Sequence, residues 1–495
     1  MHSRKLIAFL IILIAIYYSC TSVSEQNTQS AQNPSIDSTF LCDPNSAFYK
    51  LAGSLELPLL TDIPNYSNTD SLIAYLQNAA DTFSWKTFIA LNWPATRSGD
   101  PDTTQCFANN SAVSVVWESW MPNTDIFDTE TGFPKLWPTG TAAIKPLQNN
   151  IEVHQLRISK VDSAFTIFDA EQFPVVDSRH MYTLFENFYN RSAYDYIVKG
   201  KLYNKAGQTG FSKTWPNLTT GFYPVKNGHD TLNIAAYFKR AYFSVGNAKD
   251  SVETQPDLLH GDSSTYTIYF TKDPGAMIIK SAWVVLVPGK DDTSKYLTRT
   301  IWVKNGHETK MRTLGLVGMH IMHKVAEQTQ WVWSSFEHID NAPVIDEKGN
   351  AILKQGVDYL YFDEAKNDAS LYNKKPSSVF ESNPFKRVPT QVVQLKGPQK
   401  STEMINDYFY NLIKKADTNS KWLNYRLIGT QWAFQSDFFT MGSNYQPSIL
   451  ANPILETYIQ STSSCMGCHS QARFLNDSVH YGYNADFVWE LANVK

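Results

Sequence analysis

The spacing of apolar residues indicates three helices outside the middle of the chain. From Asp70 to Ala90, apolar side chains recur every three or four residues, and Asn92-Trp93-Pro94 follows as a stop. Similar spacing predicts a second helix near Met181 to Val198 and a third from Ser401 to Lys415. Each helix would turn its apolar face toward a hydrophobic core.

The middle of the chain has a pattern typical of β-strands. Thr265–Phe270, Met277–Val287 and Thr298–Val303 are rich in β-branched and aromatic residues. The turn-forming pairs Pro274-Gly275 and Pro288-Gly289 separate these segments. The sequence therefore predicts an α+β fold, with a β-rich middle and a helical C-terminal region.

The first 20 residues have the layout of an export signal. A positively charged start, Met1-His-Ser-Arg-Lys5, precedes an apolar stretch from Leu6 to Ile16 that is too short to span a bilayer comfortably. The segment ends in Tyr17-Tyr18-Ser19-Cys20, and a cysteine after a small residue is typical of a bacterial lipoprotein cleavage site. We therefore expect Cys20 to carry lipid. Tyr17 stands where such sites usually have an aliphatic residue, so cleavage without lipidation is an alternative, as is a single membrane anchor.

Three regions follow from this layout: a signal peptide at 1–19, a polar tether at 20–45 and one globular domain at 46–495. The tether is poor in aromatic residues, which is typical of flexible linkers. The whole chain is 43% hydrophobic and 18% charged, enough apolar material for a large core. With 43 Lys+Arg against 47 Asp+Glu and no basic run, nucleic acid is not expected as a partner. The membrane would be reached through the N-terminal lipid.

Near the C-terminus, Cys465-Met466-Gly467-Cys468-His469 matches the pattern C-x-x-C-H. In this pattern two thiols add to the vinyl groups of a haem and the histidine ligates its iron. With five cysteines and 11 histidines in 495 residues, on the order of 0.001 chance matches are expected. A thioredoxin-like redox pair would need a βαβ context, and a zinc site a second ligand pair nearby; neither is visible. We expect one covalent haem c, attached at Cys465 and Cys468, with His469 as the proximal iron ligand.

The other cysteines can be assigned by elimination. Once Cys20 and the two cysteines of the motif are set aside, Cys42 and Cys106 are left. In an oxidising extracytoplasmic compartment these two are expected to form a disulfide. Two separately buried thiols are the alternative.

The motif lies at the end of the chain rather than near its start. Only residues 470–495 follow, and they contain no methionine and one histidine, His480. The sixth iron ligand must therefore be His480, come from upstream, or be absent. The small all-helical cytochrome c fold alone is not expected, and 461–495 would be the haem-attachment segment of the large domain. Arg473 could pair with a haem propionate or lie on the surface as a solvated side chain.

Side chains able to ligate a metal also gather upstream, at His320, His323, Glu337 and His338. A helix over 314–326 would bring the first two histidines to one face, whereas a strand would place them on opposite faces. The segment could equally be buried core with hydrogen-bonded histidines.

This upstream segment has the densest supply of imidazole and thioether groups in the chain. We therefore expect His320 or His323 to approach the distal face of the haem. Met441, which is close to the motif in sequence, is the next candidate.

Four segments also resemble a known family. Trp85–Pro94, Gly315–His320, Trp331–Asn341 and Ser464–His469 are similar to segments of a broad, functionally uncharacterised family of bacterial extracytoplasmic cytochrome c proteins of similar length. The resemblance spans most of the mature chain. It implies haem attachment at the cysteines and histidine of the motif, and it implies no substrate.

These observations predict electron transfer by a c-type cytochrome in the periplasm, with redox partner proteins that the sequence does not identify. An enzyme is the alternative: a haem-dependent oxidoreductase or peroxidase-like catalyst with an open distal iron site. The large aromatic-rich domain favours it, because a simple electron carrier needs a smaller scaffold. A ligand-binding or sensory haem module is a third possibility.

Overall fold

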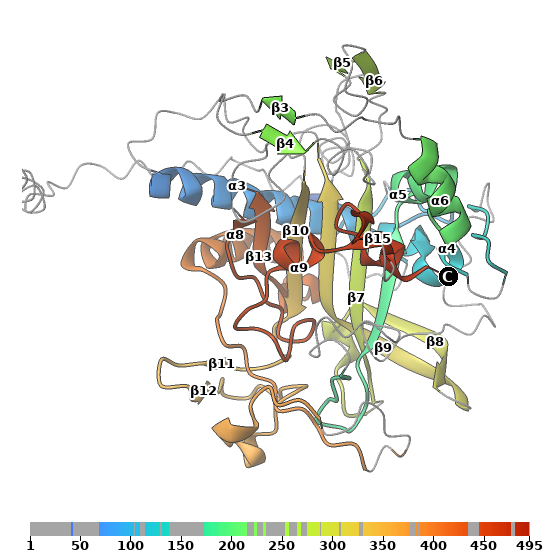
Figure 1. The fold of residues 1–495 in the computed structure, drawn as a ribbon. Coiled ribbons are helices and arrows are strands. Elements are labelled where there is room, and N and C mark those ends of the chain that lie inside the picture. The colour runs from blue at the N-terminus through green and yellow to red at the C-terminus, as the bar shows by residue number, and fades with distance from the viewer. Residues whose placement is uncertain are drawn as a thin grey trace, which may run out of the picture. The chain divides into compact units, whose positions relative to one another are not determined.

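One antiparallel sheet organises the part of the chain that the structure describes. In the computed structural model its strands follow the order β1-β2-β7-β9-β10-β13-β14, and β8 pairs with part of β9 (Figure 1). The eight strands are β1 Met121–Pro122, β2 Leu184–Tyr189, β7 Met277–Val285, β8 Thr298–Asn305, β9 Glu308–Lys324, β10 Trp331–His338, β13 Tyr425–Ala433 and β14 Tyr445–Gln446. The strands expected at 277–287 and 298–303 are confirmed as β7 and β8. The prediction of a mixed α+β fold with a β-rich middle is also confirmed.

The structure describes 41–42, 69–102, 104–108, 114–128, 131–137, 173–214, 222–224, 231–233, 253–256, 265–268, 275–287, 289–305, 308–325, 330–376, 383, 386–433, 445–476 and 481–494. All of these residues belong to one compact unit, 38–495. The signal at 1–19, Cys20, Met441 and His480 lie outside the described residues, as does the tether apart from 41–42. No helix in the described ranges is long and apolar enough to cross a membrane.

Two helices cover one face of the sheet. The helix expected at 70–90 is confirmed as α3, Thr69–Leu91, and the one at 401–415 as α8, Lys400–Ala416. The helices are joined by a hydrogen bond of 2.8 Å from Trp85 Nε1 to Asn406 Oδ1. Ser84 on α3 meets Ser334 on β10, with 2.7 Å between their hydroxyl oxygens. Even-numbered positions in this part of β10 therefore face α3.

The C-terminal segment covers the opposite face. Trp333, next to Ser334 in β10, contacts His469 of α9, and neighbouring residues of a strand point to opposite faces. Figure 1 shows α9 and β15 on the side of the sheet away from α3 and α8. The expected helical C-terminal region is not shown: the only helices in its described residues are the short α9, Cys465–His469, and a 3-10 helix, Trp489–Asn493. Between them the chain forms a hairpin of β15 and β16, Arg473–Asn476 and Tyr481–Asn484.

The helix predicted near 181–198 is wrong in its first half. Residues 184–189 form β2, which pairs antiparallel with β7, and only Arg191–Lys199 forms a helix, α5. Asn190 separates the two, because its side chain accepts a hydrogen bond of 3.0 Å from Ala193 N and caps the helix. The apolar residues of Leu184–Tyr189 fit either periodicity, and pairing with β7 decides for the strand.

The segment 314–326, whose pattern fits both a helix and a strand, belongs almost entirely to β9. This 17-residue strand is paired with β7 along one edge, and along its other edge with β8 and then β10. These long-range pairings satisfy the backbone groups along both edges and decide for the strand. His320 and His323 therefore point to opposite faces of the sheet.

The remaining described elements are short. The helices are α4 Asn123–Ile126 and α6 Lys205–Thr214. The hairpins are β3–β4 (Phe222–Pro224 with Thr231–Asn233), β5–β6 (Glu253–Pro256 with Thr265–Ile268) and β11–β12 (Val344–Ile345 with Ala351–Ile352). The other 3-10 helices are Val116–Ser119, Thr293–Lys295, Glu364–Lys366, Ala369–Leu371 and Lys421–Asn424. The strand expected at 265–270 is thus present as β6.

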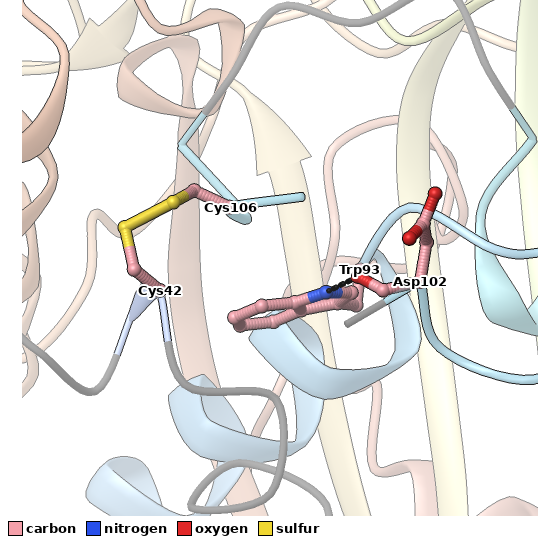
Figure 2. The surroundings of a disulfide bond; sticks show 4 residues. All are labelled: Cys42, Trp93, Asp102 and Cys106. Carbon is pink, nitrogen blue, oxygen red and sulfur yellow. Dashed lines mark hydrogen bonds between the residues drawn. A yellow bond between two sulfur atoms is a disulfide. The ribbon is translucent and has the colours of Figure 1, made fainter. Parts of the chain in front are cut away.

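The disulfide expected by elimination is present in the structure. Cys42 and Cys106 are bonded and close a loop with a sequence separation of 64 (Figure 2). Beside the bond, Phe107 N donates to Leu41 O at 2.9 Å. Figure 2 also shows Trp93, whose Nε1 donates to the backbone oxygen of Asp102 at 3.1 Å. The bridge therefore ties the start of the described chain to the loop after α3.

Candidate functional site

The C-x-x-C-H motif forms the short helix α9. Ser464 caps its N-terminus, where the serine Oγ accepts a hydrogen bond of 3.1 Å from Gly467 N. A Cβ at position 467 would lie 2.8 Å from that oxygen, so glycine at this position lets the cap close tightly. The sequence from Ser464 to Gly467 therefore determines where the helix begins.

A glutamine on the sheet holds this helix in place. Gln431, on β13, accepts a hydrogen bond of 2.7 Å from Met466 N through its Oε1. Its Nε2 donates to Ser464 Oγ at 3.0 Å and to Pro447 O at 2.7 Å. One buried side chain thus anchors the first turn of α9 and the segment that follows β14.

The two cysteines of the motif lie one helical turn apart, which places their side chains on the same side of α9. Both are thiols in the structure. Cys465 packs into the core with Met466, while Cys468 is partly exposed. A flat group lying across this turn could reach both sulfur atoms from the same side.

The orientation of His469 is set by two contacts. Its Nδ1 is 2.7 Å from the backbone oxygen of Phe487. Because a carbonyl oxygen only accepts, Nδ1 carries the proton and Nε2 carries the lone pair that a metal could take. The imidazole also packs against Trp333, with 4.5 Å between the ring centroids and 59° between the planes. The hydrogen bond and the ring packing together fix the orientation of the His469 imidazole.

The indole of Trp333 adds an unused donor next to this histidine. Its side chain is buried, and Nε1 has no hydrogen-bond partner among the described residues. A buried N–H without a partner is costly, so a carboxylate or carbonyl group bound beside α9 would be a favourable acceptor.

The structure separates the two histidines of β9. His320 lies on the α9 face, paired with Ser335 across the ladder, and its Nε2 is 3.3 Å from Glu456 Oε2. His323 lies on the α3 face, where its ring is 5.5 Å from the ring of Phe83. The two cannot serve the same side of one haem.

Glu337 and His338, the other potential ligands, belong to the core. Glu337 Oε1 accepts from Arg426 Nη2 at 2.8 Å, and burial raises the pKa of this glutamate. The ring of His338 stacks on Tyr296 with 4.2 Å between centroids, and burial lowers the pKa of this histidine to about 4. Both side chains are committed to packing and pairing inside the domain.

Arg473 lies in β15, where its Nη1 donates to the backbone oxygens of Ser470 at 2.8 Å and Ala472 at 3.0 Å. These bonds fold the guanidinium back onto the end of α9. Its proposed pairing with a propionate stays a prediction, as do the roles of Met441 and His480.

Sequence reasoning missed the residues that support His469. The oxygen of Phe487 belongs to the backbone, and every residue has a backbone oxygen, so the sequence does not indicate which one accepts this hydrogen bond. Asp486 precedes it and pairs with Lys324 at the end of β9. Lys324 closely follows the mostly apolar segment 314–322, which was a usable signal, because buried lysines need a partner.

Among the described residues, no group of three His, Cys, Asp or Glu side chains is placed to hold a metal ion. In a haem site the porphyrin supplies four ligands, so one protein nitrogen is enough on the proximal side. In comparisons with known proteins, no family model, no curated protein and no solved structure matches this chain.

Proposed function

We propose that this chain is a c-type haem protein, with thioether bonds from Cys465 and Cys468 and with His469 as the proximal iron ligand. The observation that carries the proposal is the bond from His469 Nδ1 to Phe487 O, because it puts the proton on Nδ1 and the lone pair on Nε2. A metal-binding histidine usually donates its other N–H in this way. Segment 461–495 would be the haem-binding part of the domain.

The residues around α9 fit a haem. Two thiols on one turn match the two vinyl groups, and the unpartnered Nε1 of Trp333 supplies a donor for a carboxylate of the cofactor. The apolar surroundings of Cys465 and Met466 suit a hydrophobic macrocycle. The bound haem would supply one-electron redox chemistry, and the chain would attach it, orient it and limit its contact with water.

Electron transfer is the function that needs the fewest further assumptions. The export signal and the lipid that we expect on Cys20 would keep the haem outside the cytoplasm and near a membrane. Redox partner proteins would dock close to α9, because Cys468 is the partly exposed member of the motif. The distal ligand would be His320 or Met441, with His323 less favoured because it faces α3.

A specific observation supports an enzyme as the second candidate. His320 contacts Glu456 and His323 contacts Phe83, so both histidines of β9 are engaged within the domain. If they keep these contacts when haem is bound and Met441 does not ligate, the distal position is open to a small substrate such as a peroxide.

A haem stain after denaturing electrophoresis tests the proposal, because only covalent haem survives that treatment. The chain should be produced in a host that matures haem c. Wild type and Cys42→Ser/Cys106→Ser should stain, whereas Cys465→Ser/Cys468→Ser should not. Each variant loses two cysteines, so the control separates haem attachment from loss of thiols in general. A wild type that does not stain contradicts the proposal.

A further inference from the structure

A buried ion pair lies next to the backbone group that orients His469. Lys324, the last residue of β9, places Nζ 2.9 Å from Asp486 Oδ1 and 3.0 Å from Oδ2. The lysine side chain is 0% exposed and that of the aspartate 2%. Removing both charges from water is costly, so such a pair is weak evidence for stability. The pair instead affects the geometry of the 486–487 turn.

The aspartate belongs to a turn with unfavourable backbone angles. Asp486 and Phe487 have φ values of 48° and 68°. For residues other than glycine this left-handed conformation costs about 1 kcal/mol or more each. Neighbouring contacts must therefore hold the turn in this shape.

Those contacts come from two residues that are paired on the neighbouring strands β9 and β10. Lys324 on β9 pairs with Trp331 on β10 in the strand register. Lys324 binds the carboxylate of Asp486, and Trp331 Nε1 donates to its backbone oxygen at 2.8 Å. The end of the β9–β10 ladder thus holds both the side chain and the backbone of the turn.

The next residue in the turn acts on the histidine. Phe487 O accepts the Nδ1 proton of His469 at 2.7 Å, and its position depends on the two preceding contacts. Trp333, two residues beyond Trp331 on the same face of β10, packs against the imidazole ring. The sheet therefore reaches His469 by two routes, one through the turn and one through the indole.

We infer that Lys324 and Asp486 are positioning residues for His469: through the 486–487 turn they set the hydrogen bond that makes Nε2 the iron ligand and adjusts its basicity. This inference rests on the proposed haem function for its redox consequence. The hydrogen bond gives the imidazole more anionic character, which stabilises the oxidised iron and lowers the midpoint potential.

The double variant Lys324→Met/Asp486→Asn tests the inference. It removes both charges together, so no unpaired charge is left buried, and asparagine tolerates the left-handed conformation. Its midpoint potential should rise relative to wild type, while the haem stain stays. The matched control Glu337→Gln/Arg426→Met removes a second buried ion pair, located between β10 and β13. It should leave the midpoint potential unchanged, because it does not touch the 486–487 turn.

Trp331→Phe provides a milder second variant in case the double variant does not fold. It keeps a smaller aromatic ring and loses the N–H that binds Asp486 O, while the ion pair of Lys324 and Asp486 remains, so the potential should rise by a smaller amount. A folded, haem-loaded double variant with the wild-type potential would overturn the inference. If the double variant does not fold, an unchanged potential in Trp331→Phe would overturn it.

A readout that does not require haem distinguishes this inference from the proposed function. With ¹⁵N-labelled histidine, NMR of the 11 imidazoles reports which nitrogen of each carries the proton, and His469→Gln assigns the signal of interest. In wild type His469 should be protonated on Nδ1. In Lys324→Met/Asp486→Asn it should become a mixture of tautomers. If wild type carries no haem but shows this change, the proposed function fails and the positioning role stands.

Discussion

His469 and Phe487 are joined by a hydrogen bond of 2.7 Å from the imidazole Nδ1 to the backbone oxygen. This bond connects the helix that carries the C-x-x-C-H motif with a turn that follows the β15–β16 hairpin. From this geometry we expect the His469 imidazole, rather than another nearby side chain, to ligate the iron. In His469→Gly the haem should stay attached through the cysteines but lose its low-spin spectrum, and added imidazole should restore that spectrum. A low-spin spectrum unchanged by His469→Gly would show that another residue is the proximal ligand.

The sixth iron position can be assigned by comparing variants of the two β9 histidines. His320 is on the α9 face and His323 on the α3 face, so only His320→Ala is expected to convert a low-spin iron to high-spin. His323→Ala serves as the control, because it removes an imidazole of the same strand. A wild-type spectrum with the near-infrared sulfur-to-iron band would instead indicate Met441. A high-spin wild type that binds carbon monoxide readily would favour the enzyme.

The buried Asp81 predicts a pH-dependent stability. Burial raises its pKa to about 6 from 3.8, despite hydrogen bonds from Thr402 Oγ1 at 2.7 Å and Gln77 Nε2 at 3.0 Å. A raised pKa in the folded state means that its stabilising contribution is complete below pH 3.8 and is lost as the pH rises through 6. The loss is about 3 kcal/mol.

Urea unfolding of wild type and Asp81→Asn at several pH values between 4 and 8 measures this effect. Asparagine cannot ionise, so the free energy of unfolding of the variant should decline less over this range by about that amount. Parallel pH profiles for the two proteins would show that Asp81 does not have the raised pKa.

The disulfide predicts a loss of stability in Cys42→Ser/Cys106→Ser. The sequence separation of 64 corresponds to about 4 kcal/mol of loop-closure entropy in the unfolded chain. Urea unfolding should show a lower midpoint for the variant, whereas its visible spectrum should match wild type. Equal unfolding midpoints with and without reductant in wild type would contradict this account.

Alanine substitutions at two glycines of β9 test how tightly the sheet is packed at each position. A Cβ on Gly315 would lie 3.0 Å from the ring of Tyr296, whereas on Gly318 it would lie 3.4 Å from Ala282 Cβ, an ordinary contact. Gly315→Ala should therefore destabilise the protein by about 1–3 kcal/mol, and Gly318→Ala by less. Thermal unfolding measures both, and a larger loss in Gly318→Ala would contradict the packing described here.

The sequence predicted those elements whose apolar pattern fits only one type of secondary structure. Helices α3 and α8 have apolar residues at helical spacing over a long stretch, and β7 and β8 are β-branched segments bounded by turns. It failed at 184–189 because the apolar spacing of β2 fits a helix as well, and the pairing with β7 that decides between them is a long-range contact. For β9 the same ambiguity was recognised, and its two paired edges resolve it.

The site divides in a similar way. Cys465, Cys468 and His469 are recognisable because their chemistry requires a fixed local spacing. The support of His469 depends on Lys324, Trp331 and the oxygen of Phe487, which come together only when β9, β10 and the C-terminal turn meet. Contacts between distant segments and backbone acceptors have no local signature, so the sequence alone could not predict them.

Mass spectrometry of the tryptic peptide Leu427–Arg473 tests whether Cys465 and Cys468 carry covalent haem. Trypsin cleaves after Arg426 and Arg473, and no lysine or arginine lies between them, so the peptide contains the whole motif. After denaturation, this peptide from a host that matures haem c should carry the added mass of one haem. The same peptide from Cys465→Ser/Cys468→Ser should carry none. A wild-type peptide with the mass of the polypeptide alone would contradict the account.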